Sequence, residues 1–261
     1  LIMGGLVGAA GTMVWFVLVS VNLDRNPAVP WSVAVMAVYL VLYWWFLRGG
    51  IVSWKSANRR ELLRIEPLSS AGWNWAMLAL VLGFLAALVF LIGIYARLVD
   101  IPADGFPNTG STPWYVVVAY IAMVGIVAGV AEEAGYRGYM QVELERAYGP
   151  IAAVTISSVV FALAHWSIAL LPFIATVGAV LGVVAYLARS IWPGIIVHGG
   201  YDILMTILAW RFGYPKVPDL DVAKGVDEPF VIAATLTALA ATGSVWAMTN
   251  LAREQRDISS G

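Results

Sequence analysis

Apolar stretches of about twenty residues recur along the whole 261-residue chain and constrain its fold more than any other feature. Each is long enough to cross a hydrocarbon core of about 30 Å as a helix. Hydrophobic residues make up 61% of the chain and charged residues 12%, against about 25% charged residues in soluble domains. Because helices satisfy their own backbone hydrogen bonds in lipid, the sequence predicts an all-α, polytopic integral membrane protein.

We expect about eight transmembrane helices in one membrane domain over residues 1–261. The expected spans lie near 1–21, 30–47, 73–97, 114–136, 151–170, 172–188, 190–211 and 229–250. The first lacks the basic n-region and cleavage site of a signal peptide, so we expect it to be retained. The two halves lack the matching broken helices that inverted-repeat transporters use.

The positions of Lys and Arg predict the orientation of the chain, because these residues concentrate on the cytoplasmic side. With eight spans and both termini in the cytoplasm, ten of the fifteen fall inside: Arg48, Lys55, Arg59, Arg60, Arg64, Arg137, Arg146, Arg189, Arg253 and Arg256. The longer outer loops are acidic and hold Asp100, Asp104, Asp219, Asp221, Asp227 and Glu228. The basic segment 48–72, with Trp54, Trp73 and Trp75 at its margins, is typical of a stretch at the lipid headgroups, and equally of an ordinary inner loop.

Composition also excludes several classes of function. A net charge of −1 without a basic stripe excludes a nucleic-acid partner. The chain has no cysteine, which excludes disulfides, thiolate catalysis and metals bound by cysteine. Membrane lipid is the expected surrounding, and the sequence leaves the oligomeric state open.

The two histidines of the chain, His165 and His198, both lie in strongly apolar stretches, as does the pair Glu132-Glu133. Ionisable groups inside a membrane segment are costly and therefore indicate function. On a helix that begins at Trp114, Glu133 and Arg137 are four residues apart and can pair, while Glu132 is rotated by roughly 100° and points elsewhere. The alternative is that both glutamates mark a helix end in headgroup water.

Gly149-Pro150 is a helix stop followed by a helix start, so residues 114–148 and 151–170 should form an antiparallel hairpin. Glu132 precedes Gly149 by seventeen residues and His165 follows it by sixteen, which puts both roughly 25 Å along their helices. We therefore expect a Glu132 oxygen within direct or one-water reach of His165, with His198 facing the same cavity.

The next expected turn, near Arg189 to Pro193, leads into His198-Gly199-Gly200-Tyr201-Asp202. The i,i+4 spacing aims the imidazole of His198 and the carboxylate of Asp202 the same way, and the two glycines allow close helix approach. Each histidine alone could be a core residue bonded to a backbone carbonyl. Together with the carboxylates they can activate water, bind a metal or stabilise an oxyanion, which indicates hydrolysis. Ser157 and Ser158 are not placed as a triad requires.

The order Glu-Glu-x-x-x-Arg (132–137), Phe-x-x-x-His (161–165) and His-x-x-x-Asp (198–202) resembles the CPBP intramembrane proteases. That family includes the Ras-converting CAAX endopeptidases and bacterial homologues linked to bacteriocin processing or immunity. The resemblance covers roughly residues 114–211, the expected catalytic core, and implies an eight-helix intramembrane endopeptidase whose site admits a peptide or membrane-anchored protein from the cytosolic side.

By motif position, the resemblance makes Glu132 the catalytic base, with His165 helping to activate the water. It assigns His198 and Asp202 to the oxyanion or to a metal site, and Glu133, Arg137 and Phe161 to structural support. The CAAX-processing members usually carry Asn where this chain has Asp202, and a carboxylate fits a metal ligand better than an oxyanion donor. Glu132, His165, His198 and Asp202 would form a reasonable zinc set, which the sequence slightly favours, while a metal-free, glutamate-dependent mechanism stays open.

Two other classes of function use the same features. In a proton-coupled transporter, Glu132 and the histidines would relay protons, but the chain lacks repeat symmetry. A noncatalytic membrane scaffold would keep the fold and bind partners, but the three motifs are all intact. The sequence favours the intramembrane peptidase, and neither the substrate nor its prenylation can be read from it.

Overall fold

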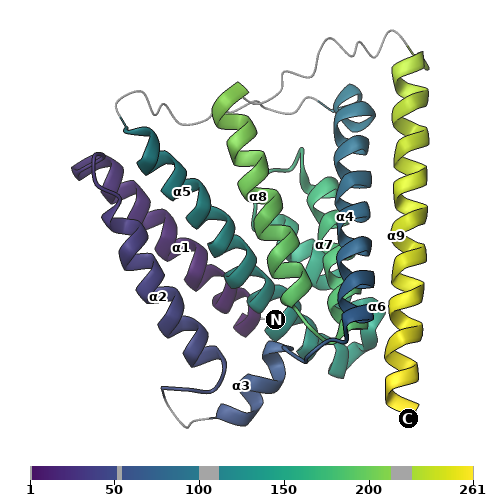
Figure 1. The fold of residues 1–261 in the computed structure, drawn as a ribbon, viewed down its shortest axis with the longest axis horizontal. Coiled ribbons are helices and arrows are strands. Elements are labelled where there is room, and N and C mark those ends of the chain that lie inside the picture. Colours follow the sequence, from purple (N-terminus) through teal and green to yellow (C-terminus); the bar gives the residue numbers. More distant parts are fainter. Residues whose placement is uncertain (1, 52–54, 100–111, 213–224, 261) are drawn as a thin grey trace.

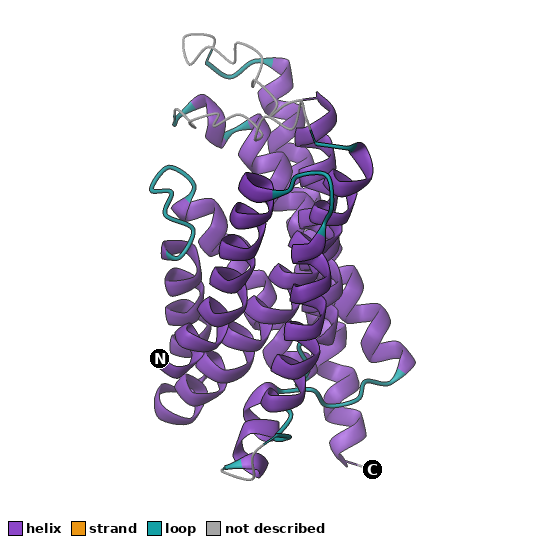
Figure 2. Ribbon diagram, turned by 90° about the vertical axis from the view of Figure 1, so that its left-hand side faces the viewer, coloured by secondary structure: helices purple, strands orange, loops and turns teal. Residues whose placement is uncertain are grey.

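The computed structural model describes residues 2–51, 55–99, 112–212 and 225–260. Figure 1 and Figure 2 show a bundle of helices, with no strand in these ranges, so the expected all-α class is confirmed. The elements are α1 (Ile2–Arg25), α2 (Trp31–Leu47), α3 (Ser56–Leu63), α4 (Ser70–Gly93), the 3₁₀ turn η1 (Tyr95–Arg97), α5 (Trp114–Val127), the π-helix η2 (Ala128–Met140), α6 (Gln141–Leu163), α7 (Leu171–Ala188), α8 (Trp192–Phe212) and α9 (Glu228–Ser260).

A helix lies in each of the eight expected ranges, but the count of eight transmembrane spans is not confirmed. Among the described residues, the helices long and apolar enough to cross a membrane are five: Ile2–Arg25, Ser70–Arg97, Trp114–Leu163, Leu171–Ala188 and Glu228–Ile258. α2 is apolar but has only 17 residues. α8 is continuous, but His198, Asp202 and its glycines lower its mean hydropathy, which explains why it is not one of the five. The chain is an integral membrane protein with several spanning helices.

The chain reverses at Gly149-Pro150, as predicted. Gly149 has φ 80° and ψ 169°, which breaks α6 into two parts. Glycine adopts a positive φ without strain, and proline suits the first turn of the helix that follows. Across the turn, the rings of Tyr136 and Phe161 pack edge-on with centroids 5.2 Å apart. The antiparallel hairpin therefore places the second part of α6 against η2.

α6 ends at Leu163, whereas the sequence predicted a helix to residue 170. The residues that follow form a turn, in which Trp166 has a positive φ of 56°. The hydroxyl of Ser167 accepts a hydrogen bond from the backbone amide of Leu170, and Pro172 lies in the first turn of α7. Because proline disfavours helical backbone before it, a new helix has to start here. His165 consequently lies just beyond α6 instead of within it.

Both termini lie in the half of the bundle that carries α3 (Figure 1). Polar contacts at that end join α3 and the next residues to the first part of α6 and to the residues after α7. They are Arg64–Glu145, Arg146–Glu61 at 2.5 Å, and an antiparallel bridge between Ile65 and Ser190. The cytoplasmic placement of this end stays a prediction.

At the other end, Arg97 after α4 pairs with Asp227 before α9 at 2.9 Å. The amide of Phe230, which donates to Asp227, and the guanidinium of Arg97 hold the pKa of Asp227 below its usual value. This contact joins α4 to α9 at the end of the bundle opposite α3. Four acidic residues expected in outer loops, Asp100, Asp104, Asp219 and Asp221, lie outside the described residues. The same holds for Trp54 of the basic segment.

Helix η2 is in close contact with backbone on two sides. On one side it packs on α1, where a Cβ added to Gly135 would lie 2.5 Å from the Gly8 nitrogen. On the other side, α8 approaches so closely that a Cβ at Gly129 would lie 2.5 Å from the carbonyl oxygen of Ile195.

Just before η2, a Cβ at Gly199 of α8 would lie 2.5 Å from the carbonyl oxygen of Gly125 in α5. The predicted role of Gly199 in helix approach is confirmed. Gly200 was expected to share it, but a Cβ there would meet nothing within 4 Å.

Candidate active site

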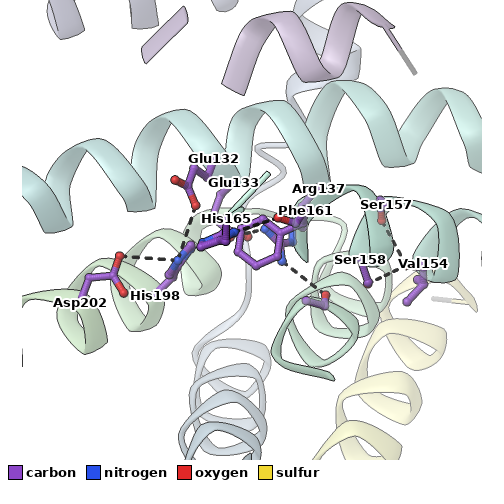
Figure 3. A network of polar contacts seen from close by, with 11 residues as sticks. Glu132, Glu133, Arg137, Val154, Ser157, Ser158, Phe161, His165, His198 and Asp202 are labelled. Atoms are coloured by element: carbon purple, nitrogen blue, oxygen red, sulfur yellow. Dashed lines mark hydrogen bonds and ion pairs between the residues drawn. The ribbon is translucent and has the colours of Figure 1, made fainter. Parts of the chain in front are cut away.

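His198 is the residue on which the candidate site converges (Figure 3). It is buried in α8, and its Nδ1 lies 2.9 Å from Oε1 of Glu133. Because a carboxylate accepts, Nδ1 carries the hydrogen of this bond, and Nε2 is the open position of a neutral ring. Nε2 lies 3.8 Å from Oε2 of Glu132 and 3.8 Å from Oδ2 of Asp202. The expected convergence of His198 and Asp202 is thereby confirmed.

Glu133 also pairs with Arg137, as its spacing predicted. Oε1 of Glu133 lies 3.0 Å from Nη1 of Arg137, and the side chains are 0% and 1% exposed. Arg137 in addition donates from Nη2 to the carbonyl of Gly178 in α7, at 3.4 Å. A Cβ at Gly194 would lie 2.7 Å from Oε2 of Glu133, so α8 packs directly on this carboxylate. The support that Glu133 and Arg137 provide therefore extends to the orientation of His198.

The two adjacent glutamates do not point to different partners, contrary to the expectation from an α-helix. Both reach the ring of His198, one at each nitrogen. They lie in η2, whose i→i+5 hydrogen bonds put more residues into each turn than the 3.6 of an α-helix. Neighbouring residues are therefore separated by a smaller angle than about 100°, and Glu132 and Glu133 can face the same helix.

Phe161 forms a wall of the site. The guanidinium carbon of Arg137 lies 4.0 Å from the centroid of its ring. The rings of His165 and His198 pack edge-on against it, with centroids 4.7 Å and 5.8 Å away. Figure 3 shows these side chains gathered where η2, α6 and α8 meet. Phe161 thus contacts both histidines, which lie on one side of the bundle.

Glu132 differs from Glu133 in having no hydrogen bond. Its Oε2 is buried and has no hydrogen-bond partner among the described residues, and its side chain is 13% exposed. A buried carboxylate without a partner is costly, and functional sites are where such groups are retained. Asp202 is 30% exposed and provides the more open side of the site.

His165 contributes an imidazole in a different way. Its Nδ1 lies 2.8 Å from the carbonyl oxygen of Phe161, so this nitrogen carries the hydrogen and Nε2 is open, as in His198. The residue is exposed, in the turn after α6. Of the two imidazoles, that of His198 has a nitrogen within 4 Å of Glu132. The expected reach of Glu132 to His165 through one water stays a prediction.

In the part of the chain that the structure describes, no three His, Asp or Glu side chains are grouped as a metal ion requires. Zinc ligands lie about 2 Å from the ion, so the four candidate donors would have to converge on one point. The expected zinc set of Glu132, His165, His198 and Asp202 is therefore not assembled here, and zinc binding stays a prediction.

The hydroxyl groups of Ser157 and Ser158 both donate to the carbonyl of Val154, at 3.2 Å and 2.6 Å. Neither is bonded to a histidine, in agreement with the expectation that no serine triad is present. These serines belong to the internal bonding of α6.

Several residues that shape the site were missed by sequence reasoning. Gly178 and Gly194 contact the Arg137–Glu133 pair, and no motif singled them out. Gly125 and Gly129 allow α8 to approach, since a Cβ at Gly129 would lie 2.5 Å from the carbonyl oxygen of Ile195. Their four-residue spacing is a recognised small-residue signal for helix packing in membranes and could have identified them.

Comparison with known proteins identifies one related family. A family model described as "Type II CAAX prenyl endopeptidase Rce1-like" matches residues 113–204. This range begins just before α5 and ends within α8, so it contains all the side chains of the candidate site. A search of curated proteins and a search of solved structures each gave no match.

Proposed function

We propose that this chain is an intramembrane endopeptidase of the CPBP/CAAX protease family and that it hydrolyses peptide bonds with a water activated by Glu132. The match of residues 113–204 to the family model supports the peptidase class. The observation that carries this proposal is the pairing pattern around His198. Glu133 is neutralised by Arg137 and accepts the hydrogen bond from Nδ1 of His198. Glu132 has no hydrogen-bond partner among the described residues and faces Nε2 of the same ring.

The gap of 3.8 Å between Glu132 and His198 exceeds a direct hydrogen bond and suits a small polar reactant placed against both groups. In the proposed reaction, Glu132 accepts a proton from water as the water oxygen attacks the carbonyl carbon of the substrate. The same proton then passes to the departing amine when the C–N bond breaks. His165, with Nε2 open, assists at the exposed side.

His198 and Asp202 serve the opposite side of the reacting carbonyl in this proposal. When Nε2 carries a proton, His198 can donate to the developing oxyanion, and Glu133 at Nδ1 stabilises the resulting imidazolium. Asp202 in its protonated form would be a second donor to the same oxyanion. The substrate is a peptide or membrane-anchored protein whose scissile bond lies close to the membrane.

The direct test is cleavage of peptides by the purified full chain in lipid vesicles. Lipidated and unlipidated versions of one quenched fluorescent peptide library are incubated with wild-type protein and with Glu132→Gln. We expect cleavage by the wild type alone, and the lipidated peptides report whether an anchor is recognised. Substrate binding without cleavage by the wild type would favour the scaffold alternative.

Asp202→Asn and a chelator separate the two routes to hydrolysis. If the reaction is metal-free, Asn supplies a permanent donor, and the variant keeps or gains activity while chelators have no effect. If zinc takes part, metal content and activity fall together in the variant, and added zinc partly restores the rate. Elemental analysis of active wild-type protein distinguishes the outcomes. The donor types favour the zinc-dependent outcome slightly, and active wild-type protein without metal would overturn that preference.

A further inference from the structure

A groove outside the candidate active site lies between α2, α3, α5, η2 and the start of α8. Its volume is about 760 Å³, within the range of roughly 300–1,000 Å³ of small-molecule sites. Its walls include Leu40 and Trp44 of α2, Val130 of η2 and Trp192 of α8. The rings of Trp44 and Trp192 pack 5.2 Å apart. None of the catalytic side chains proposed above lines it.

One part of the groove opens toward lipid. Val41 of α2 and Ile126 of α5 line it and are 69% and 47% exposed on apolar helix surfaces. An occupant can therefore enter sideways from the bilayer, and the apolar walls suit a hydrocarbon chain.

The other part of the groove is cationic. Arg48, directly after the end of α2, and Arg60 of α3 both line it and are exposed. Neither forms an ion pair with another described residue. By contrast, Arg64 and Arg146 at the same end are paired with Glu145 and Glu61. Tryptophans next to basic residues are typical of the headgroup level of a membrane.

We propose that this groove is a binding site for an anionic phospholipid, with the headgroup phosphate at Arg48 and Arg60 and an acyl chain beside Trp44 and Trp192. Basic pockets between membrane helices bind such headgroups by charge, and the apolar part adds the burial of hydrocarbon. A neutral lipid or prenyl chain would fill the apolar part but leave the two guanidinium groups without a counter-charge.

Quenching of tryptophan fluorescence by brominated lipids tests the proposal. The full chain is placed in vesicles that contain brominated phosphatidylglycerol or brominated phosphatidylcholine at equal mole fraction. We expect stronger quenching by phosphatidylglycerol. The groove is lined by three tryptophans, Trp44, Trp45 and Trp192. The variant Trp44→Phe/Trp45→Phe/Trp192→Phe should remove this excess, because no tryptophan then lines the groove.

Charge variants test the headgroup contact. Each basic residue near an anionic lipid contributes about fivefold in affinity, so Arg48→Gln/Arg60→Gln should lose most of the preference. Arg25→Gln/Arg211→Gln removes the same charge at the opposite end and should keep it. Circular dichroism establishes that both variants are folded.

Equal quenching by the two lipids in the wild type would overturn the proposal, as would an excess that persists in the tryptophan variant. Equal effects of the two charge variants would also contradict it, and so would displacement of the lipid by inorganic phosphate at constant ionic strength. The last would indicate a site for free anions. Displacement of both lipids alike by a prenylated peptide would assign the groove to substrate instead. The assay does not measure cleavage, so its outcome is independent of the proposed protease function.

Discussion

Glu132 and Glu133 are neighbours in the sequence and both reach His198, yet only Glu133 has its charge balanced by an arginine. The carboxylate of Glu133 joins Arg137 to His198 in a region closed to solvent. That of Glu132 is held at the edge of the same region without a hydrogen bond. Stability and reactivity are thereby assigned to adjacent positions.

Replacing each glutamate should separate these roles. Glu133→Ala strands the buried charge of Arg137 and leaves Nδ1 of His198 without an acceptor, and breaking a buried pair costs about 3–5 kcal/mol. We expect a marked drop in the unfolding temperature. Glu132→Gln should leave that temperature nearly unchanged and lower the cleavage rate by a factor of about 10²–10⁴, as loss of a general base does. Full activity of Glu132→Gln would remove it from the mechanism.

At this scale the sequence predicted the ion pair Glu133–Arg137 and the approach of His198 to Asp202, because both follow from i,i+4 spacing. It placed Glu132 and His198 at one cavity, but it did not predict that Glu132 and Glu133 both reach the ring of His198. The π-helical winding of η2 changes the angle between neighbours, and a count based on 3.6 residues per turn cannot include it. The sequence also predicted His165 within a helix, but it lies after the end of α6. That end depends on the turn before Pro172, which hydrophobicity alone does not show.

Among the helices, α5, η2 and α8 are held together by glycines where side chains would normally interdigitate. Gly199 lies against Gly125, and the next residue, Gly200, faces open space. The spacing of the sequence indicates close approach but not which of two adjacent glycines provides it. That choice depends on the rotation of α8 about its own axis.

The pair Gly199→Ala and Gly200→Ala makes this rotation measurable. A methyl group at 199 collides with the Gly125 carbonyl, and such overpacking costs about 1–3 kcal/mol. Because α8 carries His198, cleavage should fall as well. At 200 the same substitution should be neutral or raise stability by up to about 1 kcal/mol, from helix propensity. Thermal unfolding and peptide cleavage would be measured for both; equal losses would contradict the packing.

For the whole molecule, the sequence predicted more of the topology than of the packing. A helix occupies every expected range, and the order of the three motifs identified the family that the comparison also found. The contact of α1 with η2 was not foreseen, since hydrophobicity shows that a helix is in the membrane but not which neighbour it meets. The small residues Gly4, Gly8 and Gly11 on one face of α1 are the signal that would have suggested this contact.

Labelling of introduced cysteines tests the orientation of the whole chain. Because the protein has no cysteine, each introduced one is the sole target of a maleimide. Asn58 in α3 and Asn26 after α1 are both exposed and lie at opposite ends of the bundle. An impermeant maleimide added to intact cells should label Asn26→Cys and spare Asn58→Cys until the membrane is opened. The reverse pattern would place the α3 end outside.

The contact between α1 and η2 also constrains the order in which the helices can pack during synthesis. Gly135 follows Gly8 by 127 residues, and chains grow at about 5–20 residues per second, so α1 is made roughly 6–25 s before the helix it packs against. During that interval its glycine face must rest against lipid or α2. When η2 is made, α1 is therefore already in the bilayer and can act as a template for the helix that carries the two glutamates.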